Sequence, residues 1–85
     1  MSEVLDKVRD YILREFLPGA EPDELSESTP LITGGIIDSI ATLRLVVFLQ
    51  EEFGIELVAR DTDAENLDTL AHIVRLVESK LEAAR

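Results

Sequence analysis

The sequence predicts an all-α domain, a small four-helix bundle of three long helices and one short helix with a long first loop. Apolar residues recur at steps of three and four along three segments, which is the spacing of helices that bury one face. No strand pattern of useful length appears, because the run at residues 55–58 is too short and isolated to build a sheet. A length of 85 residues allows a single domain, placed at 1–85.

The first predicted helix covers residues 3–17 and stops at Pro18-Gly19, since these residue types rarely continue a helix. A long connection follows over residues 18–37 and contains further proline and glycine residues. Connections of this length are uncommon in so small a domain and are often functional. Three apolar side chains are expected to pin it to the core: Leu25, Leu31 and Ile32.

The second predicted helix covers residues 39–53 and ends at Gly54, which suits the left-handed conformation of a helix C-cap. An acidic linker over residues 55–68 contains one short turn at residues 64–67. The last helix begins at Asp68-Thr69, either of which is a suitable N-cap. Its apolar stripe consists of Leu70, Ile73, Val74, Val77 and Leu81.

The second helix carries two apolar stripes. We expect the first stripe to contact the core. It consists of Leu45, Val46, Leu49 and Phe53, with Thr42 at its edge. The second is rotated around the helix axis and consists of Ile40, Leu43 and Val47. Either this helix is central and covered on both sides, or the second stripe meets a partner or shelters an attached chain. The residues predicted nearest to solvent are Ala41, Arg44, Gln50, Glu51 and Glu52.

Composition and charge limit the possible partners. A formal net charge of −10, from 18 acidic and 8 basic residues, argues against binding to nucleic acid or to an anionic membrane. The chain has no cysteine, so it cannot form disulfides or supply a thiol nucleophile. It shows no signal sequence and no apolar run of transmembrane length. We therefore expect a cytoplasmic monomer that does not insert into membranes.

Other candidate sites are weak. His72 is the only histidine and has no cysteine or second histidine to share a metal, so we interpret it as a solvated surface side chain. Residues 61–65 have alternating carboxylates like the start of a calcium loop, but Asn66 and His72 stand where that loop needs glycine and glutamate. We therefore predict no dedicated metal site and no catalytic residues.

The pair Asp38-Ser39 stands at the start of the second helix. Free backbone N–H groups and the positive end of the helix dipole favour an anionic group at such a point. The Ser39 hydroxyl is therefore a candidate to carry a phosphate diester. Alternatively, Ser39 is simply a helix cap, and the chain is an unmodified acidic helical adaptor.

Three segments resemble the acyl carrier protein family: Gly-Ile-Ile-Asp-Ser-Ile at 35–40, Glu-Glu-Phe-Gly-Ile-Glu-Leu at 51–57, and Glu-Asn-Leu-Asp-Thr-Leu at 65–70. The resemblance covers essentially the whole chain. It implies an acyl-carrier-type bundle with a 4′-phosphopantetheine arm on Ser39, installed from coenzyme A by a phosphopantetheinyl transferase. The thiol of the arm would carry acyl or aminoacyl groups as thioesters. The residues that correspond to the family's partner-docking positions are Asp38, Ile40, Leu43, Arg44, Val47 and Glu51.

The chain departs from the family pattern at two places. Ile40 replaces the usual leucine, a mild change of similar volume. Ala41, Arg44 and Val47 stand where carriers of fatty-acid synthesis present an acidic face. This resembles stand-alone aminoacyl or D-alanyl carriers, whose partners would be an acyl- or aminoacyl-adenylate ligase and acyltransferases. The alternative is a type II fatty-acid or polyketide carrier.

Overall fold

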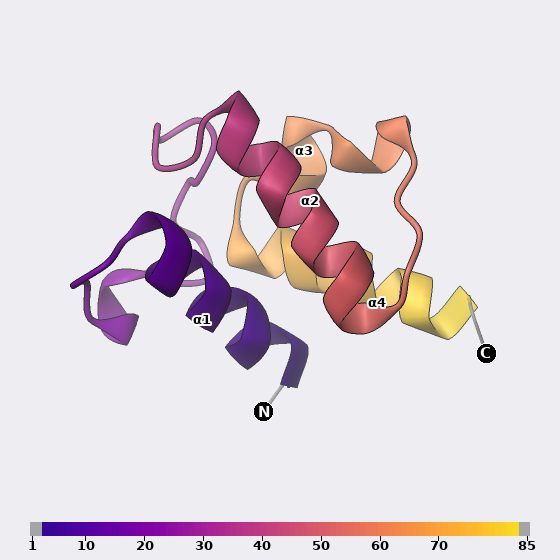
Figure 1. Cartoon of the computed structure of the whole chain (residues 1–85), viewed down its shortest axis with the longest axis horizontal. Helices are drawn as coiled ribbons and strands as arrows, with labels where there is room; N and C mark the ends of the chain where they lie inside the picture. Colours follow the sequence, from indigo (N-terminus) through magenta and orange to yellow (C-terminus); the bar gives the residue numbers. More distant parts are fainter. Residues whose placement is uncertain (1–2, 84–85) are drawn as a thin grey trace.

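A computed structural model describes residues 3–83 as a helical bundle (Figure 1). The long helices are α1 (Glu3–Phe16), α2 (Ser39–Phe53) and α4 (Leu70–Ala83), and the short helix is α3 (Ala64–Leu67). Within residues 3–83 there is no strand, so the predicted all-α class is confirmed. Met1, Ser2, Ala84 and Arg85, which the predicted domain 1–85 includes, lie outside the described residues.

Two single 3₁₀ turns, η1 (Pro22–Glu24) and η2 (Ala59–Thr62), add to the predicted elements. The first lies in the long connection and the second precedes α3. Both are too short to show a helical repeat of apolar residues, so the periodicity of the sequence could not predict them.

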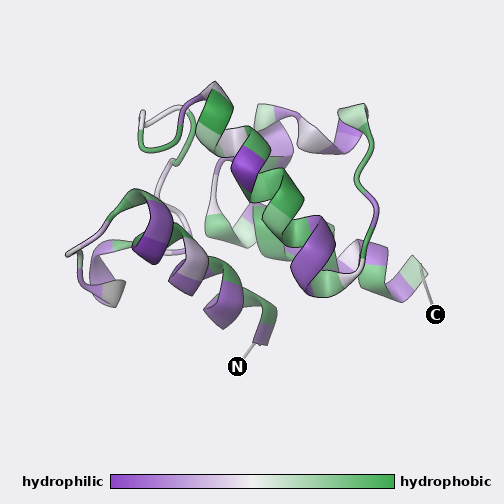
Figure 2. Cartoon of the chain, in the orientation of Figure 1, coloured by the Kyte–Doolittle hydropathy of each residue, from purple (hydrophilic) through white to green (hydrophobic). Residues whose placement is uncertain are grey.

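Helix α1 packs mainly against α4 and also contacts α2. Val8 and Ile12 are fully buried on its inner face, while the outer face is charged. Figure 2 shows this division as a hydrophilic outer surface along α1 and an apolar edge toward the other helices. The amphipathic pattern that predicted the helix is therefore also what orients it.

Aromatic side chains join α1 to α2. The Tyr11 and Phe48 rings are stacked, with centroids 3.9 Å apart, and Phe16 meets Tyr11 edge to face at 5.6 Å. The Tyr11 hydroxyl donates a hydrogen bond of 3.2 Å to the Arg44 carbonyl oxygen, and burial raises the pKa of Tyr11. The stacked ring and the hydrogen bond of Tyr11 together hold α1 beside the middle of α2.

Helix α2 buries the first of its two stripes and exposes the second. Leu45 and Leu49 are fully buried, whereas Ile40, Leu43 and Val47 are exposed by 71%, 66% and 50%. The helix is therefore not covered on both sides, and the expectation that it is central and fully covered is wrong. That the exposed second stripe meets a partner or shelters an attached chain stays a prediction. In Figure 2 most of the α2 ribbon has apolar colours, interrupted by hydrophilic residues. Gly54 ends the helix with φ 64°, as the predicted C-cap requires.

Two of the residues predicted nearest to solvent on α2 lie further inside. Gln50 is half-buried because its Oε1 accepts a hydrogen bond of 2.9 Å from the Leu57 N–H. Ala41 is half-buried because it packs against the core. Arg44, Glu51 and Glu52 are exposed as predicted.

The long connection is pinned to the core as predicted. Leu25 and Leu31 are buried, Ile32 is half-buried, and Ile37 is buried immediately before α2. The chain turns tightly at Gly34, where an added Cβ would clash with the Pro30 carbonyl oxygen. The connection is therefore an ordered part of the bundle that brings the chain to Asp38-Ser39.

Helix α4 is capped by Thr69, whose Oγ1 accepts a hydrogen bond of 3.1 Å from the His72 N–H. Leu70, Ile73, Leu76 and Val77 are buried, so Leu76 joins the predicted stripe while Val74 and Leu81 are half-buried. Lys80 on α4 lies 2.7 Å from the Asp61 carboxylate and ties η2 to the bundle. No helix within residues 3–83 is long and apolar enough to cross a membrane.

Candidate functional site

Asp38 is the N-cap of α2. Its backbone is extended, with φ −95° and ψ −170°, and its Oδ1 accepts a hydrogen bond of 2.8 Å from the Ala41 N–H. The Asp38 carbonyl oxygen accepts further hydrogen bonds from the N–H and the hydroxyl of Thr42, at 2.8 and 2.7 Å. The alternative in which Ser39 is the cap is therefore wrong, because its neighbour occupies that position.

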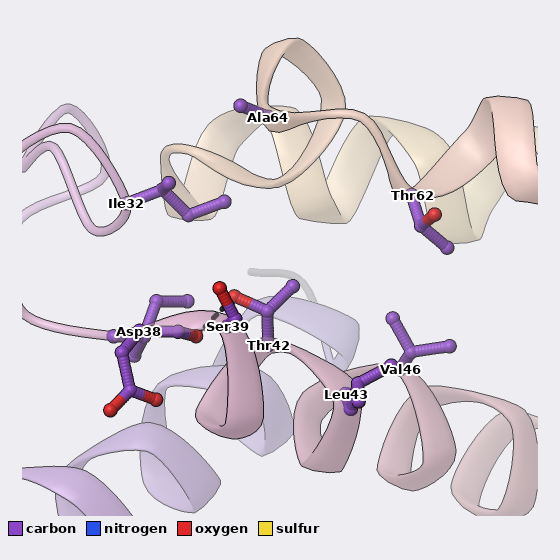
Figure 3. A pocket seen from close by; sticks show the side chains of 9 residues that line it. Ile32, Asp38, Ser39, Thr42, Leu43, Val46, Thr62 and Ala64 are labelled. Atoms are coloured by element: carbon purple, nitrogen blue, oxygen red, sulfur yellow. Dashed lines mark hydrogen bonds between the residues drawn. The ribbon is translucent and has the colours of Figure 1, made fainter.

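Ser39 is the first residue of α2, and its side chain is exposed. Among residues 3–83 no partner forms a hydrogen bond with the Ser39 hydroxyl. In Figure 3 this hydroxyl points into the space between α2 and the segment that carries Thr62 and Ala64, while the Asp38 carboxylate points away from it. The oxygen is thus accessible, and the fold does not use it to stabilise the helix.

The Ser39 side chain lies at an open cavity of about 680 Å³ between α2, the end of the long connection and the segment from η2 to α3. The lining is mostly apolar, with threonine hydroxyls at two places. It consists of Ile32, Ile37, Asp38, Ser39, Thr42, Leu43, Val46, Thr62 and Ala64. Such a lining suits a largely apolar ligand with a few hydrogen-bonding groups.

We compared the chain with known proteins. No protein-family model matches the chain. Over 83 residues, which are 98% of this chain and 100% of the relative, it is 31% identical to the acyl carrier protein of Phenylobacterium zucineum (strain HLK1). The chain belongs to the acyl carrier protein family. The predicted family resemblance is thereby confirmed.

In this member of the acyl carrier protein family, all the residues predicted to dock partners lie on or next to α2 and are exposed: Asp38, Ile40, Leu43, Arg44, Val47 and Glu51. Leu43, Val47 and Glu51 also line a shallow groove of about 390 Å³ against Tyr11 and Phe48. Their docking role stays a prediction.

Arg44 is the basic residue in the middle of this face. Its Nη2 lies 3.0 Å from Glu15 Oε1 on α1, and its guanidinium group lies 5.7 Å from the centroid of the Phe16 ring. Its charge is thus partly balanced by Glu15, and the exposed centre of α2 is apolar rather than acidic. Arg44 and Val47, which stand where the family resemblance implies acidic residues, are therefore exposed on the surface of α2.

The other candidate sites are accounted for by simple contacts. His72 is exposed, as predicted. Asp61 pairs with Lys80 and accepts a hydrogen bond of 3.0 Å from the Val58 N–H, and both contacts hold the pKa of this carboxyl below its usual range. Over residues 3–83, no group of histidine, aspartate and glutamate side chains is arranged to hold a metal ion.

Sequence reasoning missed several residues of this site. Ile32, Thr62 and Ala64 reach the cavity beside Ser39 from distant parts of the chain. Ile32 was predicted only as a contact with the core, and no local pattern marks Thr62 or Ala64. Asp68 was predicted only as an alternative cap for α4, yet its carboxylate binds the long connection. These contacts depend on tertiary structure, so a single sequence carries no signal for them.

Proposed function

We propose that this protein carries acyl or aminoacyl groups on a 4′-phosphopantetheine arm attached to Ser39. The observation that carries the proposal is the Ser39 hydroxyl, exposed and free of hydrogen bonds within residues 3–83, at the first residue of a 15-residue helix. Membership of the acyl carrier protein family supports it independently.

The residues around Ser39 fit such an arm. A phosphodiester there would lie near the positive end of the α2 dipole, which favours negative charge. The Asp38 carboxylate is engaged by the Ala41 N–H and turned away from the cavity, which limits its repulsion of a phosphate. The apolar walls suit the methyl groups of a pantetheine chain. The Thr42 and Thr62 hydroxyls donate to the Asp38 and Ala59 carbonyl oxygens, so their oxygens remain as acceptors for the amide N–H groups of the arm. When bound, the arm supplies a thiol that forms thioesters, which a chain without cysteine cannot supply itself.

The chain's own part in the modification is that of a nucleophile held in place. The Ser39 oxygen forms the new P–O bond, and the phosphoanhydride of coenzyme A breaks, with Mg²⁺ and the transferase assisting. The nucleotide leaves, and the transferase accepts the hydroxyl proton. Asp38 fixes the first turn of α2 and thereby the position of Ser39. We assign no catalytic residue for acyl transfer to this chain.

The test is the intact mass of the protein after incubation with coenzyme A, Mg²⁺ and a broad-range phosphopantetheinyl transferase. We expect one added phosphopantetheine on the native chain and none on Ser39→Ala. The matched control is Ser28→Ala, which removes another exposed hydroxyl and should be modified like the native chain. A native chain that stays unmodified, with the transferase active on a known carrier, would favour the unmodified helical adaptor instead.

We further propose that an adenylate-forming ligase loads the arm, because the exposed centre of α2 is apolar and its basic residue is Arg44. The alternative is a type II fatty-acid or polyketide carrier, whose enzymes would prefer an acidic face. Transfer of malonyl groups by a fatty-acid acyltransferase separates the two. We expect poor transfer to the native carrier and better transfer to Arg44→Glu. Arg75→Glu on α4 makes the same charge change on an exposed residue elsewhere and should have no effect.

Native transfer equal to that of the acyltransferase's own carrier would contradict the ligase assignment but leave the carrier function intact. A cytoplasmic location and a monomeric state remain part of this proposal.

A further inference from the structure

The carboxylate of Asp68, at the junction of α3 and α4, binds the long connection that precedes Ser39. Its Oδ1 accepts hydrogen bonds from the N–H groups of Ile32 and Thr33, at 2.8 and 2.9 Å. Its Oδ2 accepts a third from the Thr33 hydroxyl, at 2.9 Å. The Asp68 carbonyl oxygen also accepts one from the Leu31 N–H, at 2.6 Å. One residue thus holds three consecutive residues of the connection.

A second set of hydrogen bonds carries this anchoring to the start of α2. The Leu31 carbonyl oxygen accepts hydrogen bonds from the N–H groups of Ile36 and Ile37, at 2.9 and 3.0 Å. These bonds close the loop 31–37 on itself, around the tight turn at Gly34. Ile37 is buried and is followed directly by Asp38 and Ser39. Asp68 is therefore linked to Ser39 through its hydrogen bonds to residues 31–33, the hydrogen bonds within loop 31–37, and the chain itself from Ile37 to Ser39.

The anchored loop is also a wall of the Ser39 cavity. Ile32, whose N–H binds Asp68, lines this cavity together with Ile37. In Figure 3 Ile32 lies across the cavity from Ser39 and Thr42. Any movement of the loop would therefore change the start of α2 and the opposite wall at the same time.

We infer that Asp68 is a positioning residue for the modification of Ser39. Its carboxylate fixes loop 31–37, and this loop sets the position of the Ser39 hydroxyl at the start of α2. The inference rests on the proposed function, since it concerns the reaction at Ser39. Small displacements of a nucleophile slow a reaction strongly even when the binding surface is intact. Asp68 lines neither the cavity beside Ser39 nor the groove beside Val47. Removal of the Asp68 carboxylate should therefore lower kcat and leave KM nearly unchanged.

The experiment compares phosphopantetheinylation kinetics of the native chain with those of three variants. We expect Asp68→Ala to lower kcat by about tenfold, with KM changed less than about twofold. Asp68→Asn keeps an acceptor for the Ile32 and Thr33 N–H groups and a polar partner for the Thr33 hydroxyl, so it should restore most of the rate. Thr69→Ala is the matched control, because it removes the adjacent cap of α4 without touching the loop.

Amide hydrogen exchange gives a readout that does not depend on the transferase. In Asp68→Ala the N–H groups of Ile32, Thr33, Ile36 and Ile37 should exchange faster, while those in the middle of α1 stay protected. In Thr69→Ala the loop amides should exchange as in the native chain.

Two results would overturn the inference: native kcat in Asp68→Ala, or an equal loss of kcat in Thr69→Ala, which would show a general effect of lost stability. Either would leave the proposed function standing, because the native chain is still modified. A native chain that is not modified would instead overturn the proposed function and the inference with it.

Discussion

Asp38 and Ser39 are neighbours in the chain, but the structure separates their roles. Asp38 uses its carboxylate and its carbonyl oxygen to complete the first turn of α2. The Ser39 hydroxyl forms no hydrogen bond with any other residue in the range 3–83. A polar pair at the start of a helix is thus divided into one residue that stabilises and one that remains free to react.

This division predicts opposite effects of two alanine substitutions. Asp38→Ala should lower the free energy of unfolding by about 1 kcal/mol, because the Ala41 N–H loses its partner. Ser39→Ala should change it by less than about 0.5 kcal/mol, since an exposed side chain without partners is removed. Urea unfolding followed by circular dichroism measures both. A larger loss for Ser39→Ala than for Asp38→Ala would contradict the assignment of the cap.

Asp38→Asn separates capping from docking. Asparagine caps helices about as well as aspartate, so the stability should stay close to native. If the Asp38 carboxylate helps to dock the transferase, KM for modification should rise even though the fold is intact. Steady-state kinetics on the folded variant decide this. An unchanged KM would show that Asp38 serves only the helix.

At the scale of the element, α2 is the informative helix. Its sequence predicted its two stripes and both of its ends, because helical periodicity and the Gly54 C-cap are local properties. Whether the second stripe would be covered or exposed could not be predicted, since that depends on how many neighbours surround the helix. In the structure α1 and α4 contact α2, and Ile40, Leu43 and Val47 remain open to solvent.

Val47→Asp tests the docking role of the exposed stripe. Val47 is 50% exposed, so the substitution should leave the melting temperature nearly unchanged and weaken loading by the partner ligase. Leu45→Ala is the contrasting variant, because Leu45 is fully buried and its truncation should cost about 2–5 kcal/mol. Thermal unfolding and a loading assay distinguish the two. A collapse of stability in Val47→Asp would show that Val47 belongs to the core.

At the scale of the whole molecule, carboxylates fix the connections between helices. Asp61 ties η2 to Lys80 of α4, and Asp68 ties the long connection to the start of α4. The Thr33 N–H, followed by the Thr33 hydroxyl and the Ile32 N–H, holds the pKa of Asp68 below its usual range despite the opposing effect of burial. Many acidic side chains of the chain lie in these connections. Asp61 and Asp68 show that some of them form contacts within the fold.

These shifts predict how stability depends on pH. A carboxyl whose pKa is lower in the folded chain stabilises the fold above its unfolded pKa, about 4, and loses this contribution as the pH falls through the folded value. The difference in unfolding free energy between the native chain and Asp68→Asn should therefore be constant above about pH 5 and shrink below about pH 4. Urea unfolding across this range measures it. A difference that grows on acidification would contradict the shift.

The sequence was sufficient for the local features and insufficient for the distant contacts. The end of α2 at Phe53, the short α3 and the exposed His72 follow from residue type and spacing, and α1 ends at Phe16, one residue before the predicted end. The role of Asp68 could not be predicted, because its partners lie 36 and 35 positions away in the chain. The cavity beside Ser39 likewise exists only once α2 and the segment from η2 to α3 are placed together.

The most direct test of the central claim is to locate the phosphopantetheine group on the chain. Tryptic cleavage after Arg14 and Arg44 releases residues 15–44, which contain Ser26, Ser28 and Ser39. Fragmentation of this peptide from the protein modified with coenzyme A should place the added mass on Ser39. Addition to Ser26 or Ser28, or a peptide without any added mass, would contradict the account.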